Sequence, residues 1–163
     1  MPLWRAAHSG GRPRPALRGW SGPWWRPILH SLQGKRVWVA GHAGMVGQAC
    51  LRRLARIPDC TVLTVPREAL DLRRQAETED WLSAQRPDAI ILAAATVGGI
   101  MANDAAPADF LYDNLAIETN VIHAAFRTSV ARLLFLGSSC IYPLNAPQPI
   151  PERALLTGPL EPT

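Results

Sequence analysis

The fold is decided by residues 36–47, which have the sequence RVWVAGHAGMVG. An apolar run from Val37 to Ala40 is followed at once by glycines at positions 41, 44 and 47. An unbroken apolar run is typical of a buried strand, and a cluster of glycines directly after it marks a tight turn. We therefore predict a strand that enters a glycine-rich turn.

The turn is followed by the pattern of a helix and then by that of a second strand. Apolar residues recur at helical spacing from Val46 to Leu54, which predicts a helix over Met45–Arg56 that ends before Pro58. A second apolar run predicts a strand over Thr61–Val65. Strand, glycine turn, helix and strand within about thirty residues form the βαβ unit that binds the pyrophosphate of a dinucleotide, here residues 36–72.

Each glycine of the turn has a separate physical role in such a unit. Gly41 permits the tight turn, Gly44 lets the backbone approach the pyrophosphate, and Gly47 lets the helix pack closely on the strand. The phosphates would then meet the free N–H groups of the helix N-terminus, around Met45 and Val46. The alternative is a turn that is rich in glycine for packing alone.

The residue after the second strand indicates which dinucleotide is bound. Enzymes that select NAD usually place a carboxylate here, which binds the ribose 2′-hydroxyl and would repel a 2′-phosphate. This chain has Arg67 instead, and a guanidinium can bind a phosphate through two hydrogen bonds. We therefore predict NADP(H) as the cofactor; the alternative is a surface arginine without a ligand.

Two further strands extend the predicted sheet. Residues 88–95 form an unbroken apolar run, as in a parallel strand that is covered on both faces. The small side chains of Ala93 and Ala94 at its end leave room for a cofactor. Residues 132–137 form a similar run. The predicted fold class is therefore α/β, with a Rossmann-type doubly wound parallel sheet.

A long helix is predicted between these two strands. After a loop at Gly98 and Gly99, Pro107 opens a helix that extends to about Arg127. One face of it is apolar and consists of Leu111, Leu115, Ile122 and Phe126. Three polar residues on the same helix have packing or capping as their expected role, and these are Asn114, Asn120 and His123.

The last predicted strand leads into residues 138–143, which have the sequence SSCIYP. Ligands of open parallel sheets bind at the carboxyl edge, where this segment begins. There, Ser138 could hydrogen-bond a reacting carbonyl group, and Cys140 could act as an acid or base if its pKa were shifted. The alternative is that the serines only satisfy backbone groups at the end of the strand.

Length and composition favour one domain with a core, because the chain has 163 residues of which 48% are hydrophobic. Residues 1–34 contain five of the 17 basic residues and none of the 13 acidic ones, so residues 35–163 have 12 basic residues against 13 acidic ones. This balance argues against binding of nucleic acid by the domain. No apolar run has the length of a membrane span.

The cysteines indicate the cellular compartment. Cys50, Cys60 and Cys140 are an odd number without a CxxC pair or a neighbouring histidine at ligand spacing. They therefore predict neither a disulfide framework nor a metal site. We expect a reducing compartment and a cytoplasmic protein.

Residues 1–34 differ from the rest, since they are rich in proline, arginine and tryptophan and lack helical or strand periodicity. We predict a disordered basic extension ahead of the domain at 35–163. A mitochondrial transit peptide is one alternative, although its amphipathic helix would be interrupted by prolines. Binding to nucleic acid or to a membrane surface through this extension is another.

Four segments resemble the GDP-L-fucose synthase family, in the extended branch of the short-chain dehydrogenase/reductase superfamily. The spacing Gly-x-x-Gly-x-x-Gly is itself similar to that superfamily, and the matching run around SSCIYP is the most specific of the four. They lie within residues 35–163 and are VAGHAGMVG at 39–47, LAAATVGGI at 92–100, PADF at 107–110 and LLFLGSSCIYP at 133–143.

The resemblance implies roles for several residues. Ser138 would belong to a Ser/Tyr/Lys catalytic set, and Cys140 would match the cysteine that takes part in epimerising the sugar. Arg67 would receive the 2′-phosphate, while Asp71 and Leu72 would receive the adenine. The family converts GDP-4-keto-6-deoxymannose to GDP-L-fucose by epimerisation and NADPH-dependent reduction. The resemblance therefore also implies that the full-length protein binds a GDP-sugar as its substrate and forms a homodimer.

The chain departs from the family in three places. Ala43 and Thr96 stand where the family commonly has basic residues. The Tyr-x-x-x-Lys pair of the superfamily cannot be formed, because the chain has only Tyr112, Tyr142 and Lys35 of these types. We therefore expect an incomplete NADP-binding domain that lacks the substrate domain and is inactive alone.

Three hypotheses about function remain open at this point. The first is the N-terminal part of a GDP-L-fucose synthase, as a truncated product or an incomplete gene model. The second is a non-catalytic NADP-binding module that acts as a sensor or interaction domain. The third is another nucleotide-sugar epimerase or dehydratase of the extended branch, which the cysteine of the SSCIYP run disfavours.

Overall fold

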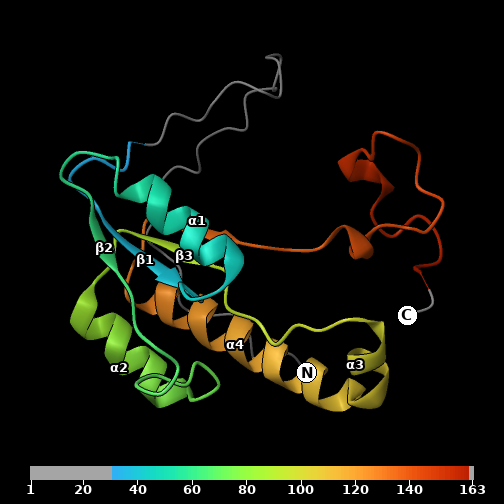
Figure 1. Ribbon diagram of the computed structural model, residues 1–163, viewed down its shortest axis with the longest axis horizontal. Helices are drawn as coiled ribbons and strands as arrows, with labels where there is room; N and C mark the ends of the chain where they lie inside the picture. Colours follow the sequence, from blue (N-terminus) through green and yellow to red (C-terminus); the bar gives the residue numbers. More distant parts are fainter. Residues whose placement is uncertain (1–30, 162–163) are drawn as a thin grey trace, which may run out of the picture. The chain divides into compact units, whose positions relative to one another are not determined.

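The computed structural model describes residues 31–161, which contain a four-stranded parallel sheet flanked by helices (Figure 1). The strands stand in the order β2-β1-β3-β4. From β1 the chain therefore moves to one side for β2 and crosses to the other side for β3. This reversal is the topological switch point at which open parallel sheets bind ligands. The strands are β1 (Arg36–Ala40), β2 (Thr61–Leu63), β3 (Ala89–Leu92) and β4 (Arg132–Phe135).

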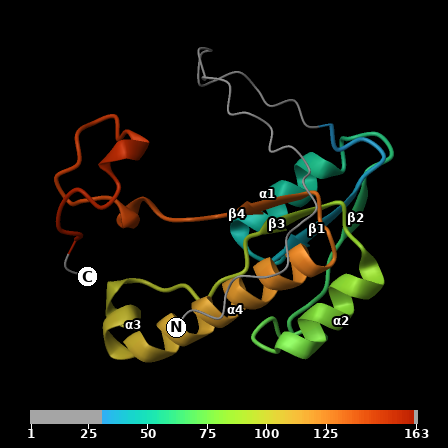
Figure 2. The ribbon, with the colours of Figure 1, turned by 180° about the vertical axis from the view of Figure 1, so that it is seen from behind.

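Helices cover both faces of this sheet. Helix α1 (Met45–Leu54) lies on one face, and helices α2 (Gln75–Gln85) and α4 (Pro107–Arg127) lie side by side on the other (Figures 1 and 2). The short helix α3 (Ile100–Ala105) precedes α4. The predicted doubly wound arrangement is therefore present.

Alternation along β1 separates two cores. Trp38 and Ala40 point to the α2 and α4 side, while Val37 and Val39 point to the α1 side, and all four are buried. Trp38 packs against Trp81 of α2 with ring centroids 4.5 Å apart. Because β1 is central and buried on both faces, it fixes the position of the glycine turn that follows it.

The elements expected from sequence are present, and several of them are shorter than expected. Helix α1 ends two residues before Arg56, and β2 and β3 are shorter than the apolar runs that contain them. Helices α2 and α3 were not expected. Helix α2 lacks an apolar stripe because it packs through little more than Trp81, Leu82 and the small side chain of Thr78, so its sequence gives no periodic signal.

The apolar face expected on α4 is not the face that packs on the sheet. The four large apolar residues predicted to form that face are exposed, and Phe126 is 82% exposed. The packed face lies opposite and is made of smaller residues, namely Ile117, Asn120, Val121, Ala124 and Ala125. Helix α4 is therefore apolar on two sides, and the side predicted from sequence is the one with the larger residues. The side that packs in the core with residues of β1 and β3 has smaller side chains, which allow close packing.

Strand β4 is an exposed edge of the sheet. Among the strands that the structure describes, it pairs with β3 alone, and each of its four residues is exposed. Its apolar side chains Leu133, Leu134 and Phe135 are all more than a third exposed. Among the described residues, the sheet therefore ends at β4 in an open edge with an exposed apolar face.

Most of the predicted extension, residues 1–30, lies outside the described residues. Leu32 already packs against the core on the α1 side, so the end of that extension belongs with the domain. None of the described helices has the length and the apolar character of a membrane span.

Candidate functional site

The glycine turn joins β1 to α1 at the carboxyl edge of the sheet. Gly41 has a φ of +82°, a conformation that L side chains rarely adopt. The N–H of Gly44 donates to the Gly41 carbonyl at 3.1 Å, and Gly44 then caps α1 with an extended backbone. The side chain of Gln48 donates to the Ala43 carbonyl at 3.1 Å. The loop is thus held in one shape by its own hydrogen bonds.

The three glycines differ in what a side chain would meet. A β-carbon on Gly41 would lie 2.6 Å from the backbone nitrogen of Ala94, and one on Gly47 would collide with the Gly41 carbonyl oxygen. One on Gly44 would meet only that oxygen, at an ordinary contact distance of 3.4 Å. The protein's own packing therefore explains two of the glycines, while the open space at Gly44 fits a group that approaches the backbone, such as a pyrophosphate.

The first turn of α1 offers hydrogen-bond donors at this point. No side chain of the described residues caps the helix, and the first N–H groups of an α-helix have no intrahelical partner. The side chains of Met45 and Val46 are exposed beside them. An anion at this end would be favoured by both the donors and the helix dipole.

The end of β3 lies beside the glycine turn at the switch point, the ligand position of open parallel sheets that is called the crevice below. The N–H of Ala93 donates to the Ala40 carbonyl at 2.9 Å, and the backbone of Ala93 and Ala94 lies against Gly41. Small side chains here leave the edge of the sheet open above the switch point. The structure therefore brings Gly41, Gly44, Gly47, Ala93 and Ala94 together, and their contact with a cofactor stays a prediction.

Arg67 lies in the loop after β2 and is exposed. Among the described residues, its guanidinium forms no hydrogen bond or ion pair. Its charge nevertheless reaches Asp71 and Asp113, because it contributes to lowering the pKa of both carboxyl groups. The group predicted to bind a 2′-phosphate is therefore free to do so.

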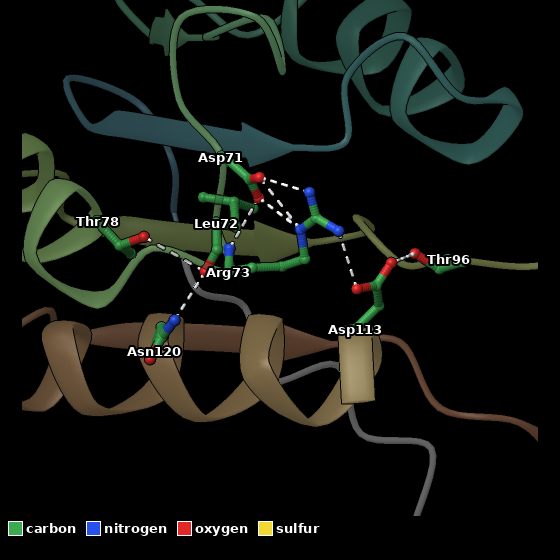
Figure 3. Close-up of polar contacts among 7 residues, drawn as sticks. All are labelled: Asp71, Leu72, Arg73, Thr78, Thr96, Asp113 and Asn120. Carbon is green, nitrogen blue, oxygen red and sulfur yellow. Dashed lines mark hydrogen bonds and ion pairs between the residues drawn. The ribbon is translucent and has the colours of Figure 1, made fainter. Parts of the chain in front are cut away.

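A second arginine, Arg73, joins the loop after β2 to α4 (Figure 3). It donates to both carboxylate oxygens of Asp71, the shortest bond being 2.6 Å, and to Asp113 at 3.0 Å. The hydrogen bond from Arg73 lowers the pKa of Asp71 to about 2 and also lowers the pKa of Asp113. The two carboxylates in turn raise the pKa of Arg73.

Asn114 and Thr96 fix the loop after β3 onto α4. The side chain of Asn114 accepts from the Thr96 N–H at 2.8 Å and donates to its carbonyl at 2.9 Å. The Thr96 hydroxyl donates to Asp113 at 3.0 Å. Asn114 thus has the packing role expected of it. Thr96, at a position that is commonly basic in the family the chain resembles, is held by the Asn114 amide and by the Asp113 carboxylate.

Asp71 and Leu72, the pair predicted to receive the adenine, both form contacts within the protein. The Asp71 carboxylate is bound by Arg73, and the Leu72 side chain is buried in the core. The Leu72 carbonyl accepts from Asn120 at 2.9 Å (Figure 3). Asn120 therefore has a packing role. A contact of this pair with adenine stays a prediction.

The two predicted catalytic residues follow β4. The Ser138 hydroxyl accepts a hydrogen bond from the Cys140 N–H at 3.1 Å, and both residues are exposed. Residues 137–160 form no hydrogen bond with the glycine turn in the part of the chain that the structure describes. Ser138 and Cys140 are therefore near one another but are not joined to the dinucleotide crevice.

Sequence reasoning missed Arg73 and Asp113. Arg73 stands two residues after Asp71, a spacing that allows a local ion pair, but Asp113 is distant in sequence and becomes a neighbour only through the packing of α4. The described residues contain no cluster of His, Cys, Asp or Glu that could hold a metal ion.

The geometry of a strand, a glycine turn and a helix at a switch point agrees with a family-level match. Residues 37–163 match the family described as "NAD dependent epimerase/dehydratase family". The chain belongs to this epimerase/dehydratase family.

Relatives within this family support the resemblance found in the sequence. The GDP-L-fucose synthase of Sinorhizobium fredii is 61% identical over 135 residues, which cover 83% of this chain and 43% of that protein. The GDP-L-fucose synthase 1 of Arabidopsis thaliana is 55% identical over 128 residues, which cover 78% of this chain and 40% of that protein. The chain therefore resembles this group closely but spans about two fifths of the length of these relatives.

Solved structures agree on the fold of this epimerase/dehydratase domain. MlghC, a GDP-mannoheptose C4 reductase from Campylobacter jejuni with NADP bound, is 35% identical and matches with a TM-score of 0.75. The match covers 81% of this chain and 41% of that one. The predicted fold class is thereby confirmed.

The single lysine of this epimerase/dehydratase chain lies away from the crevice. Lys35 precedes β1 and pairs with Asp88, which precedes β3, at 3.9 Å. Both residues are at the amino edge of the sheet, and the crevice is at the carboxyl edge. Lys35 therefore cannot reach a ligand held by the glycine turn, since β1 is about 16 Å long at the usual rise per residue.

Proposed function

We propose that residues 32–163 are the NADP(H)-binding part of a GDP-L-fucose synthase. The observation that carries the proposal is the contrast among the three glycines of the turn, because among these only Gly44 has no steric conflict with the described residues. A pyrophosphate placed there would receive the N–H groups of the α1 N-terminus. Arg67, which is exposed and unpaired among the described residues, would bind the 2′-phosphate.

The substrate and the reaction are proposed from the relatives. Proteins named GDP-L-fucose synthase are 50% to 61% identical to this chain. A GDP-sugar would therefore be the substrate of the longer protein, which we also propose to be a homodimer. The cysteines are free, which suits the proposed cytoplasmic setting.

Ser138 and Cys140 would act on the sugar in that longer protein. The Ser138 oxygen accepts from the Cys140 N–H, so its own hydroxyl proton remains available to donate to a keto oxygen. The Cys140 thiol would exchange a proton at a carbon beside the keto group, which that group acidifies. NADPH, when bound, supplies the hydride for the reduction.

This chain alone would bind the cofactor without reducing a substrate. It has no Tyr-x-x-x-Lys pair, and Lys35 is paired at the opposite edge of the sheet. The tyrosine that the superfamily uses to protonate the product alkoxide is therefore missing from this chain. If purified 1–163 oxidised NADPH in the presence of the keto sugar, this part of the proposal would be wrong.

The binding proposal is tested by titrating the 1–163 chain with NADP⁺ and with NAD⁺ in a calorimeter. We expect NADP⁺ to bind more tightly. Arg67→Glu should weaken NADP⁺ strongly and leave NAD⁺ little affected, because only NADP⁺ has the 2′-phosphate. Arg56→Glu is the charge-matched control, since Arg56 is exposed in the turn between α1 and β2.

A non-catalytic binding module is the competing proposal, and it predicts the same titrations. The two differ in the coding sequence downstream of Thr163. A Tyr-x-x-x-Lys motif within a few tens of codons would favour the enzyme, whereas an immediate stop codon in verified transcripts would favour the module.

A further inference from the structure

Four charged side chains belong to the loop after β2 and to the helix linked to it, where the 2′-phosphate is proposed to bind. Arg67, Asp71 and Arg73 belong to the loop after β2, and Asp113 belongs to α4. Two are guanidinium groups and two are carboxylates, so their charges balance. A phosphate that binds here therefore meets two potential repulsions as well as two potential attractions.

Arg73 binds both carboxylates at once (Figure 3). Its Nε and Nη2 atoms donate to Asp71, the Nη2 bond being 2.6 Å, and its Nη1 atom donates to Asp113 at 3.0 Å. These contacts are sheltered, since the side chains of Asp71 and Asp113 are only 27% and 14% exposed. The arrangement uses the donor fork of one arginine in a way that lysine could not reproduce.

The loop turns between Arg67 and Asp71, because the N–H groups of residues 69 and 70 donate to the Pro66 carbonyl at 3.0 and 3.1 Å. The charge of Arg67 also helps to lower the pKa of Asp71 and of Asp113, after the larger effect of Arg73. Through the same electrostatic interaction, the two carboxylates would repel an anion bound at Arg67. A free carboxylate in this part of a dinucleotide-binding fold selects for the ribose 2′-hydroxyl and against a 2′-phosphate. The charge balance at Arg67 therefore decides between NADP and NAD.

We propose that Arg73 is a specificity-determining residue: it neutralises Asp71 and Asp113 and thereby leaves Arg67 free to select NADP(H) over NAD(H). This inference rests on the proposed dinucleotide function and deepens it. Arg73 is a positioning residue, because it acts by binding Asp71 and Asp113 and not by contacting the cofactor.

The loop that carries these charges has other supports. The carbonyl of Leu72 accepts from Asn120 of α4 and, at 3.4 Å, from the hydroxyl of Thr78. The side chains of Leu70 and Leu72 are buried in the core. Replacing Arg73 should therefore change the charge beside Arg67 while the loop keeps its path.

The test compares NADP⁺ and NAD⁺ affinities of the 1–163 chain by calorimetry. For Arg73→Met we expect the preference for NADP⁺ to fall by about tenfold or more, because a like charge nearby commonly shifts an ionic equilibrium by that factor. The affinity for NAD⁺ should stay the same or rise. Arg74→Met is the matched control, since Arg74 is the exposed neighbour and its side chain has no described bond, and it should leave the preference unchanged.

A series of charges makes the test sharper. Asp71→Asn adds one net positive charge beside Arg67 and should raise the preference for NADP⁺ above that of the unmodified chain. The double variant Asp71→Asn with Arg73→Met restores the original balance and should recover most of the preference. The Asp71→Asn variant also decides the question if Arg73→Met does not fold, as judged by circular dichroism.

The outcomes separate the inference from the function on which it rests. If Arg73→Met weakens both dinucleotides equally, or if Asp71→Asn does not raise the preference, Arg73 only holds the structure together and the inference is wrong. If the unmodified chain binds neither dinucleotide, both the inference and the proposed function fail. If the preference for NADP⁺ depends on Arg67 but does not change when Arg73 is replaced, the proposed function is supported and the inference about Arg73 is wrong.

Discussion

The N–H of Ala93 donates to the carbonyl of Ala40 at 2.9 Å, so the ends of β3 and β1 are joined directly beside the glycine turn. This contact places the backbone of Ala93 and Ala94 against Gly41. The turn is therefore built onto the switch point of the sheet. Its glycines can be separated into those that the fold needs and one that it does not.

Gly41→Ala should destabilise the chain, whereas Gly44→Ala should not. At Gly41, a methyl group meets backbone atoms and the positive φ is strained, which together should cost about 1–3 kcal/mol or more in the free energy of unfolding. At Gly44 the cost should stay within about 0.5 kcal/mol, while NADP⁺ binding is lost. Urea unfolding and calorimetry measure the two effects, and equal unfolding midpoints for the two variants would contradict the assignment.

The ion pair of Asp71 predicts how stability depends on pH. Because the pKa of Asp71 is lowered from 3.8 to about 2 in the folded chain, its contribution to the free energy of unfolding is fully present above pH 4. It is lost as the pH falls from about 4 to about 2, where the carboxylate is protonated in the folded state as well. The stability difference between the unmodified chain and Asp71→Asn should therefore be constant near neutrality and shrink over that interval. Urea unfolding at pH 7, 4 and 3 measures it, and a difference independent of pH would exclude the pair as its cause.

Much of the fold could be predicted because β1, the glycine turn and α1 depend on local patterns. An apolar run, three glycines and a helical repeat occur within residues 36–54, and the structure places each as expected. Helix α2 could not be predicted in this way. Its contacts are made by few side chains, so burial depends on the sheet beneath it and not on a periodic stripe.

The site was predictable in part for the same reason. The glycines and Arg67 follow strand ends, which sequence order reveals. The link from Arg73 to Asp113 joins residues 40 positions apart, and it depends on which face of α4 turns toward the loop. That face was chosen wrongly from sequence, since the larger apolar residues of α4 are the exposed ones.

Asn120 should contribute more to stability than its type suggests. It is buried and donates to the Leu72 carbonyl at 2.9 Å, so Asn120→Ala leaves a carbonyl with one weaker partner and should cost about 1–3 kcal/mol in the free energy of unfolding. Asn103→Ala is a matched control, because Asn103 also lies in a helix and donates to loop carbonyls, but it is only half-buried and its hydrogen bonds are exposed. Its effect should stay within about 0.5 kcal/mol, and equal losses from both variants would show that burial is not the cause.

The open edge at β4 should make the 1–163 chain self-associate. Unpaired backbone groups and apolar side chains at an edge strand form a template for pairing with another chain, and Leu134 is 55% exposed there. Leu134→Lys should reduce association in light scattering while changing the free energy of unfolding by no more than about 0.5 kcal/mol. Leu144→Lys is the control, because Leu144 is similarly exposed but lies in the segment after β4. If both variants reduced association equally, the cause would be general apolar exposure and not the strand edge, and a chain that stayed monomeric at high concentration would contradict the prediction altogether.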